Sequence, residues 1–317
     1  MITTNLDLAK NALNSNEIIA IPTETVYGLA GNAYSEEAIG KIFALKKRPL
    51  YNPLIVHIKS AEFLTKVACD IPELAIKLAN DFWPGPLTLV LKKQAFIPDL
   101  VTAGKNTVAI RVPNHPLALN LLDQLEFPLA APSANPFGSI SPTSALHVYH
   151  YFKDDVGIIL DGGECEKGIE STIIGFENNQ PVVYRLGSLS IEDIESKIGK
   201  VFTKTNNDTA PIAPGMLSRH YAPLTDTYLT NDIEKLIQSY QDKKIGLLLF
   251  HRQIKNTHVE HQEILSKSRN LKEAAKNLYA ALHRLDKLNL DMIIAERLPD
   301  VGIGKTLNDK LQRATKK

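Results

Sequence analysis

The sequence contains only two cysteines, Cys69 and Cys165, which lie far apart in a chain of 317 residues. Two isolated cysteines exclude a disulfide framework, and they lack the number and spacing of ligands that a zinc site requires. No apolar run is long enough to span a membrane, and the N-terminal segment lacks the basic start and apolar stretch of a signal peptide. We therefore expect a cytoplasmic protein that makes no contact with a membrane.

Net charge is also nearly absent from this chain. Lys and Arg together number 36 and Asp and Glu 35, which leaves a formal charge of +1. Without an overall positive field, the chain is a poor general binder of nucleic acid, so any basic surface must be local. Apolar residues make up 44% of the chain, which is enough for a normal hydrophobic core in two domains.

The pattern of apolar residues divides the chain into two α/β units. Strands and helices alternate over residues 1–203, and a smaller α/β unit covers residues 224–317. Between them, residues 204–223 are polar, rich in Asn, Pro and Ala, and without periodicity, which is typical of a linker or a functional loop. The periodicity predicts strands at residues 17–21, 87–91, 108–112, 157–160, 245–250 and 290–295, and helices at 72–82, 116–125, 271–285 and from about Lys305.

One helix-to-strand segment brings cationic and amide side chains together. Ser35 is a candidate N-cap, and Pro49 ends the helix. The last helical turn is expected to contain residues 46–48, whose cations complement the helix dipole. This dipole role alone is one interpretation of the cations; binding of a nucleotide triphosphate and a small anionic co-substrate is the other. A strand follows at residues 54–58, because Leu54, Val56 and Ile58 alternate with Ile55 and His57.

A second strand places an arginine on a defined face. In TVAIRV, Thr107, Ala109 and Arg111 share one face and the three apolar residues share the other. A buried strand with an Arg on one face is unfavourable unless that face meets a ligand or a paired anion. The Pro- and Ser-rich stretch 131–143 and the polar run 168–172 are further candidates for ligand contact, although self-contained turns also explain them. No Ser-His-Asp triad, reactive Cys or third metal ligand beside a His pair stands out.

Six motifs in a fixed order connect these segments to a known family. They are PTETVYGLAG, KKRPLYNPLIVH, WPGPLTLVL, TVAIRVPNHPLAL, APSANPFGSISPT and GIESTIIGF. The order resembles that of the YrdC-type domain, and APGMLSRHYAP with the smaller unit resembles the two-domain threonylcarbamoyl-AMP synthases. The resemblance implies an open twisted sheet of the YrdC type with helices, plus a smaller Rossmann-like α/β domain.

The resemblance also implies a reaction and its participants. L-Threonine, bicarbonate and ATP, with Mg²⁺, would give threonylcarbamoyl-AMP and pyrophosphate, for threonylcarbamoyladenosine modification of tRNA. A separate transferase would act on the tRNA, so tRNA contact with this chain is possible but not required.

Matching the motifs residue by residue assigns the site. The tetrad of the family falls on Lys46, Arg48, Ser133 and Asn135, of which Lys46 and Arg48 are the expected catalytic residues. The implied ATP contacts are Arg48, Asn52, Thr107, Ser133, Asn135, Ser141, Arg185 and Tyr221. The implied threonine contacts are Thr25, His57, Arg111, Ala131 and Ser171. The chain departs from the family at Leu186, where a Pro is usual, and at Leu217 and Ser218 in the linker motif.

Three other functions remain open at this point. The first is an RNA-binding module with a local basic surface, and the second is a carbamoyl transferase with a different acceptor. The third is an α/β domain without activity.

Overall fold

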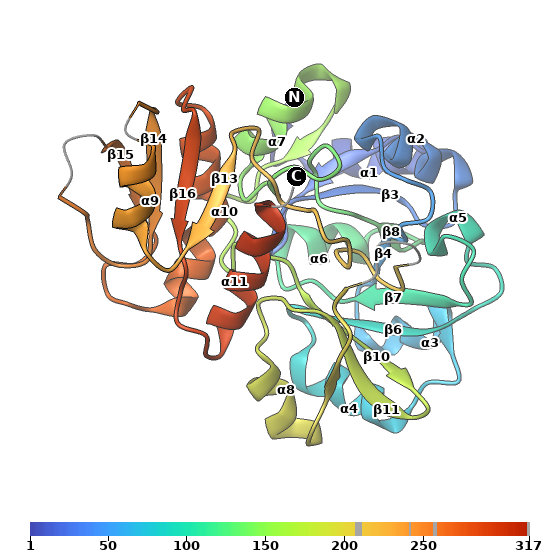
Figure 1. The fold of residues 1–317 in the computed structure, drawn as a ribbon. Helices are drawn as coiled ribbons and strands as arrows, with labels where there is room; N and C mark the ends of the chain where they lie inside the picture. Colours follow the sequence, from blue (N-terminus) through green and yellow to red (C-terminus); the bar gives the residue numbers. More distant parts are fainter. Residues whose placement is uncertain (207–210, 241, 256–258, 316–317) are drawn as a thin grey trace.

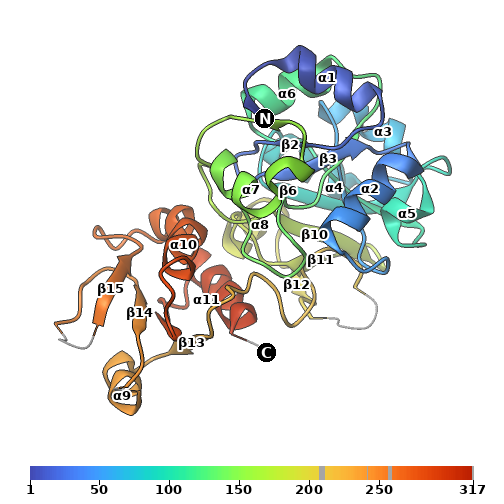
Figure 2. The same ribbon diagram turned by 90° about the horizontal axis from the view of Figure 1, so that it is seen from above.

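The computed structural model describes residues 1–206, 211–240, 242–255 and 259–315. The chain forms two sheets, each with helices packed against it, which lie next to each other (Figures 1 and 2). The expected linker includes residues 207–210, which are outside the described ranges. In these ranges no helix is both long enough and apolar enough to cross a membrane.

The larger sheet is mixed, with parallel and antiparallel neighbours. Its strand order is β1-β9-β2-β3-β8-β4-β7-β6-β10-β11-β12, and β5 pairs with β6 outside this path. The strands are β1 (Ile2–Thr3), β2 (Ile19–Ile21), β3 (Gly28–Asn32), β4 (Ile55–His57), β5 (Ala68–Cys69), β6 (Leu87–Lys93), β7 (Thr107–Arg111), β8 (Leu129–Ala130), β9 (Ile159–Leu160), β10 (Thr172–Glu177), β11 (Gln180–Arg185) and β12 (Phe202–Thr203).

Alternation along the strands separates two packed faces of this sheet. Leu89 and Ile110 belong to the main core, which the helices cover, whereas Val90 and Ala109 belong to a smaller cluster on the opposite face. That cluster also contains Met216 of the expected linker, so the linker lies on this second face. The helices of this part are α1 (Leu6–Asn14), α2 (Glu36–Lys46), α3 (Leu64–Val67), α4 (Glu73–Phe82), α5 (Asp99–Thr102), α6 (Pro116–Asp123), α7 (Ala145–Phe152) and α8 (Ile191–Ile198), with short 3₁₀ turns at η1 (Ala61–Phe63) and η2 (Lys153–Asp155).

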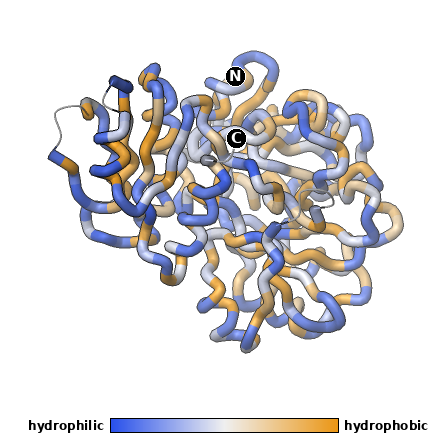
Figure 3. The backbone as a smooth tube through the Cα atoms, in the orientation of Figure 1, coloured by the Kyte–Doolittle hydropathy of each residue, from blue (hydrophilic) through white to orange (hydrophobic). Residues whose placement is uncertain are grey.

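The smaller sheet is entirely parallel, with the order β13-β16-β14-β15. Its strands are β13 (Thr227–Thr230), β14 (Ile245–Leu249), β15 (Val259–Ile264) and β16 (Met292–Glu296), and its helices are α9 (Ile233–Ser239), α10 (Leu271–Asp286) and α11 (Ile303–Ala314). Helix α9 packs on one face, and α10 and α11 pack on the other. Parallel strands buried on both faces by helices form the Rossmann-like arrangement that was predicted. Figure 3 shows the hydrophobic residues concentrated along the central strands.

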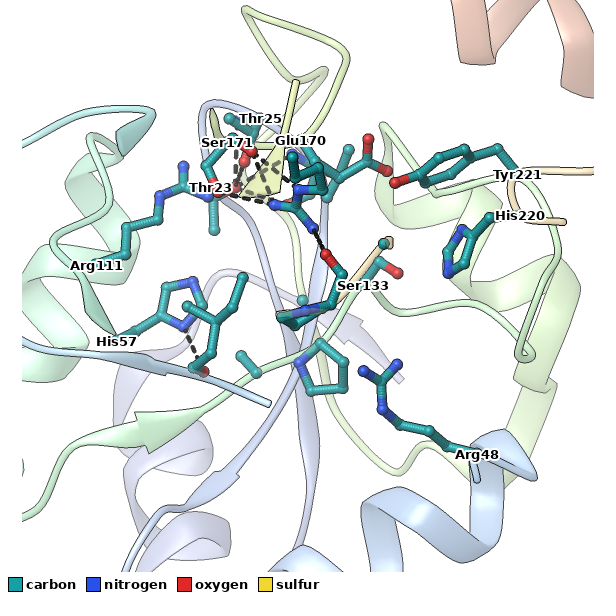
Figure 4. A pocket seen from close by; sticks show the side chains of 18 residues that line it. Thr23, Thr25, Arg48, His57, Arg111, Ser133, Glu170, Ser171, His220 and Tyr221 are labelled. Atoms are coloured by element: carbon teal, nitrogen blue, oxygen red, sulfur yellow. Dashed lines mark hydrogen bonds between the residues drawn. The ribbon is translucent and has the colours of Figure 1, made fainter. Parts of the chain in front are cut away.

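Most predicted elements are confirmed, with boundaries shifted by a few residues. Ser35 caps α2 by accepting a hydrogen bond from the backbone N–H of Ala38. The prediction for residues 46–48 needs correction, because α2 ends at Lys46. Lys47 is the C-cap in the left-handed region (φ 52°), so Arg48 lies beyond the helix. This turn redirects the chain, and the side chain of Arg48 therefore points away from the helix axis (Figure 4).

A shared hydrophobic cluster joins the two halves of the molecule. Residues of α10 and α11, including Leu278 and Leu311, pack against Val26, Ile140 and Ile169 from the larger half. Gly168 lies at this contact with φ +71°, and a Cβ atom there would be 2.3 Å from the carbonyl oxygen of Lys276 in α10. The backbones of the two halves therefore approach so closely that only glycine fits.

This contact predicts that Gly168→Ala destabilises the protein more than an otherwise comparable change. Gly104→Ala is the matched control, because Gly104 has φ +73° and open space where the Cβ would be. Backbone strain alone should cost each variant about 1–2 kcal/mol. The clash should cost Gly168→Ala roughly a further 1–3 kcal/mol. Urea unfolding of both variants measures the difference; equal losses of stability would contradict the close approach.

Candidate active site

A cavity that is partly open to solvent lies between the larger half and the linker (Figure 4). Residues from widely separated parts of the sequence form its wall. They are Thr23, Thr25, Val26, Gly28, Arg48, Ile55, His57, Arg111, Ala131, Pro132, Ser133, Glu170, Ser171, Arg185, Pro214, Gly215, His220 and Tyr221.

Arg48 forms one side of this cavity and has an unbalanced charge. Its guanidinium donates to the backbone oxygens of Asn52 (3.0 Å) and Pro53 (2.7 Å) and to Asn52 Oδ1 (2.8 Å). No carboxylate in the described ranges pairs with it. Burial and then the charge of Arg185 lower the pKa of Arg48 to about 9. The side chain remains cationic at neutral pH, and an anionic ligand would relieve the cost of its burial.

Lys46 supports the wall behind Arg48. Its ammonium is buried and donates to the backbone oxygens of Ser133 (2.5 Å) and Asn135. Burial and then the charge of Arg48 hold the pKa of Lys46 well below its usual range. The ammonium thus ties the end of α2 to the Ser133–Asn135 loop, which places the four tetrad residues beside one another.

Arg111 and His57 form the opposite side of the cavity, on neighbouring strands whose register pairs them directly. The Arg111 guanidinium is 2.7 Å from Glu24 Oε1, and both side chains are almost completely buried. Glu24 also accepts from the backbone N–H of Asn114 (3.0 Å). Burial and then the charge of Arg111 lower the pKa of His57 to about 3, so its imidazole is neutral. The predicted polar face of β7 thus meets both a paired anion and a cavity.

Arg185 and Ser171 lie between these two sides. Arg185 donates to the Ser171 backbone oxygen from Nε (3.1 Å) and Nη2 (2.9 Å), and to Ser171 Oγ (3.0 Å). A Cβ at Gly187 would be 2.2 Å from the Ser171 backbone, so Gly187 allows this approach. Leu186 packs against the main core instead of lining the cavity. The contacts of Ser171 and Gly187 therefore hold Arg185, although Leu replaces the usual Pro.

Glu170 connects the cavity to the smaller half. Its carboxylate accepts from Ser141 Oγ (2.6 Å) and Tyr279 Oη (2.9 Å), and Lys310 Nζ is 3.1 Å away. Burial by itself would raise the pKa of Glu170. The charges of Lys310 and Arg185 and the Ser141 hydrogen bond outweigh that effect and hold it at about 2. The carboxylate is therefore ionised and fully engaged, which makes it unsuitable as a general base.

The linker contributes the last part of the wall. Tyr221 is buried in the left-handed region (φ 63°), and Lys310 donates to its hydroxyl (2.9 Å). Next to it, His220 packs edge-on against the Phe137 ring. Arg313 of α11 donates to the Leu217 backbone oxygen (2.6 Å). Residues of α11 therefore hold the linker against the cavity.

The cavity brings together nine of the sequence-predicted site residues. All five predicted threonine contacts line it, as do four of the predicted ATP contacts: Thr25, His57, Arg111, Ala131, Ser171, Arg48, Ser133, Arg185 and Tyr221. The others lie behind or beside the wall. Lys46, Asn52 and Asn135 support Arg48 and the Ser133 loop. Ser141 donates a hydrogen bond to Glu170. Thr107 is the first residue of β7 and lies on the same strand face as Arg111.

Sequence reasoning missed several residues of the site. Glu24 and Glu170 both lie inside quoted motifs, and that position was the available signal. Tyr279 and Lys310 had no such signal, because they lie on amphipathic helices of the smaller half. Only the packing of that half against the larger sheet brings them to Glu170.

The buried ion pair predicts different outcomes for two lysines of α11. Lys310→Met leaves Glu170 buried without its nearest cation and should cost about 3–5 kcal/mol of stability. Lys305 makes an exposed pair with Glu192 (2.7 Å), so Lys305→Met should cost less than about 1 kcal/mol. Chemical denaturation of both variants tests this, and similar losses for the two would contradict the role of Lys310.

Comparisons with known proteins agree with this geometry. Residues 11–187 match the family described as "Telomere recombination", and residues 189–315 match the family described as "Threonylcarbamoyl-AMP synthase, C-terminal domain". The chain is 41% identical to the threonylcarbamoyl-AMP synthase of Pyrococcus abyssi, covering 97% of this chain and 93% of the relative. It is 40% identical to that of Bacillus subtilis, with 95% and 90% covered.

Solved structures resemble this chain over nearly its whole length or over its larger half. The crystal structure of P. abyssi Sua5 complexed with L-threonine matches with a TM-score of 0.92 at 39% identity, covering 99% of this chain and 97% of the other. Escherichia coli YciO shares the fold of 59% of this chain, with a TM-score of 0.52 at 22% identity. The predicted family is confirmed: the chain belongs to the two-domain threonylcarbamoyl-AMP synthases.

Proposed function

We propose that the protein forms threonylcarbamoyl-AMP and pyrophosphate from L-threonine, bicarbonate and ATP. The observation that carries this proposal is the charge of the cavity. Arg48 and Arg185 point into it with backbone and amide or hydroxyl partners, and no carboxylate of the described chain pairs with either. Such a wall suits a triphosphate next to a second anionic substrate.

The threonine end of the cavity is proposed at Arg111 and His57. Glu24 pairs with Nη2 of Arg111, and the guanidinium keeps other N–H groups for a substrate carboxylate. The neutral His57 and the hydroxyls of Thr25 and Ser171 supply further hydrogen-bonding groups. The predicted threonine contact Ala131 completes this end, and it offers only a methyl group and backbone.

The nucleotide end is proposed at Arg48, Ser133, Arg185 and Tyr221. Asn52, Thr107, Asn135 and Ser141 are proposed to complete it, as the family motifs imply. The Nδ2 atom of Asn52 and the Oδ1 atom of Asn135 support this, because both are buried without a hydrogen-bond partner among the described residues. Polar atoms buried in that way are costly unless a ligand satisfies them.

The proposed chemistry requires two bond-forming steps. The threonine amine bonds to the carbon derived from bicarbonate, with loss of water, and gives a carbamate. A carbamate oxygen then attacks the α-phosphorus of ATP, and the bond to pyrophosphate breaks. Both reactants are anions, so Arg48 and the loop held by Lys46 are proposed to act through positioning and electrostatic stabilisation.

Magnesium is proposed to enter with the nucleotide. No group of three or more His, Cys, Asp or Glu side chains in the described ranges is arranged to hold a metal. Glu170, the one carboxylate on the described wall, is already engaged by Ser141, Tyr279 and Lys310. Mg²⁺ usually keeps several waters and binds through substrate phosphates, so MgATP needs no resident metal site in the protein.

We propose the division of the chain into a catalytic domain (1–203), a lid (204–223) and a smaller domain (224–317) that holds the lid. Linker residues Pro214, Gly215, His220 and Tyr221 on the cavity wall support the lid. The contacts of Arg313 and Lys310 with the linker support the role of the smaller domain.

The product is proposed to serve threonylcarbamoyladenosine modification of tRNA. A separate transferase would use it, so direct tRNA contact by this chain is not required. We place this activity in the cytoplasm, and the presence of Cys69 and Cys165 as free thiols supports a reducing compartment.

Pyrophosphate release from the purified protein tests the proposed reaction. With MgATP present, release should require both threonine and bicarbonate, and omission of either should abolish it. Arg48→Ala should reduce kcat, because it removes a cation beside the reacting phosphate. Arg111→Ala should raise the threonine KM, because a charge-assisted contact is worth about 1.5–3 kcal/mol.

Other outcomes of the same assay would replace the proposal. Release without threonine, or turnover with carbamoyl phosphate in its place, would indicate a carbamoyl transferase with another acceptor. Salt-dependent tRNA binding without any turnover would favour an RNA-binding module.

The lid predicts that substrates protect the linker from protease. Arg219 is exposed in this segment, so trypsin should cleave after it. ATP and threonine at about ten times their dissociation constants should slow this cleavage roughly tenfold, if cleavage requires an open, unbound form. Lys153 is exposed at the end of α7 and serves as the internal control. If ATP and threonine leave the rate of cleavage after Arg219 unchanged, that result would contradict the lid.

A further inference from the structure

Strand β6 contains one hydroxyl in an otherwise apolar run, LTLVL. Thr88 is completely buried, and the single hydrogen bond of its side chain within the described chain joins its hydroxyl to Ser171 Oγ at 2.7 Å. A valine has nearly the same shape and suits a strand equally well. A buried hydroxyl is unfavourable unless its hydrogen bond is made. The structure therefore indicates that the bond to Ser171 is the reason for a threonine here.

Either hydroxyl could donate in this bond, but the proton of the buried Thr88 hydroxyl has no other acceptor in the described chain, which favours Thr88 as the donor. Arg185 Nη2 donates to Ser171 Oγ at 3.0 Å, and an arginine can only donate. A serine hydroxyl has two lone pairs and one proton. If Thr88 also donates, both lone pairs are occupied, and the proton of Ser171 remains for a third group. Ser171 lines the cavity, so that third group is a ligand.

The position of Thr88 also points to the threonine end of the cavity. The register of β6 and β7 pairs Leu89 with Ile110, and its continuation by one residue sets Thr88 opposite Arg111. Thr88 and Arg111 extend from the same face of the sheet, since both alternate with residues of the main core. A carboxylate is the natural partner there, because it accepts hydrogen bonds and donates none.

We propose that Thr88 is a positioning residue: with Arg185, it orients the Ser171 hydroxyl as a donor to the carboxylate of the amino-acid substrate. This inference rests on the proposed function. Thr88 itself does not line the cavity and acts only through Ser171. The arrangement selects an anionic oxygen at this point, because Ser171 has no lone pair left to accept from a substrate N–H.

Steady-state kinetics of Thr88→Val test the proposal. The threonine KM should rise roughly tenfold, as expected for one hydrogen bond to a charged group, while the ATP KM stays unchanged. Thr88→Ser keeps the hydroxyl and should restore the wild-type threonine KM. Thr227→Val is the matched control, because Thr227 is a buried strand threonine of the smaller domain whose hydroxyl donates to the Thr225 backbone oxygen (3.1 Å).

A double-mutant cycle with Ser171→Ala distinguishes positioning from general packing. In the Ser171→Ala background, Thr88→Val should have no further effect on the threonine KM. Additive effects, or an unchanged threonine KM in Thr88→Val, would overturn the proposal. Thr88→Cys repeats the test if Thr88→Val fails to fold, since a thiol is only a weak donor.

Failure of the proposed function would give a different result. The proposed function would be overturned, and this inference with it, if L-threonine neither stimulates pyrophosphate release by the wild-type protein nor binds to it in calorimetry. A threonine-dependent wild type with an unaffected Thr88→Val variant would overturn the inference alone.

Discussion

The site depends on one buried, ionised carboxylate, Glu170, which connects the cavity wall of the larger half to helices α10 and α11 of the smaller half. Isolated in an apolar interior, this charge would be very costly, and its hydroxyl partners and Lys310 offset that cost. Because α11 supplies Lys310, the site needs the smaller domain for its electrostatic balance. The same lysine holds Tyr221. Lys310 is the direct ion-pair partner of Glu170, and the more distant charge of Arg185 contributes to the balance.

The architecture explains how such distant residues meet. Strands β4, β6 and β7 turn their apolar residues toward the helix-covered core, and the alternate residues form the opposite face. That face would be exposed on an isolated domain, but the linker covers part of it through Ala213 and Met216. Pro214 and Gly215 of the same linker segment form part of the cavity wall. Burial of the charged side chains on this wall also reduces their contact with water, which strengthens the electrostatic interactions between them.

Local patterns in the sequence were sufficient for the elements and for part of the site. The cap at Ser35 and the alternation around Arg111 follow from rules that concern only neighbouring residues, and both are confirmed. The left-handed turn at Lys47 was missed, because a lysine seldom adopts that conformation. The ordered motifs of the family identified nine of the cavity-lining residues. They did not indicate which predicted residues support the wall from behind, as Lys46 and Ser141 do.

The sequence by itself determined the two α/β units, the family and the face on which Arg111 lies, because periodicity and motif order are properties of contiguous residues. Only the tertiary structure decided the partners: Glu24 for Arg111, Ser171 for Thr88, and Lys310 for Glu170. These pairs join residues that are tens to more than a hundred positions apart. Their formation depends on sheet register and on the packing of one domain against another, which no local pattern specifies.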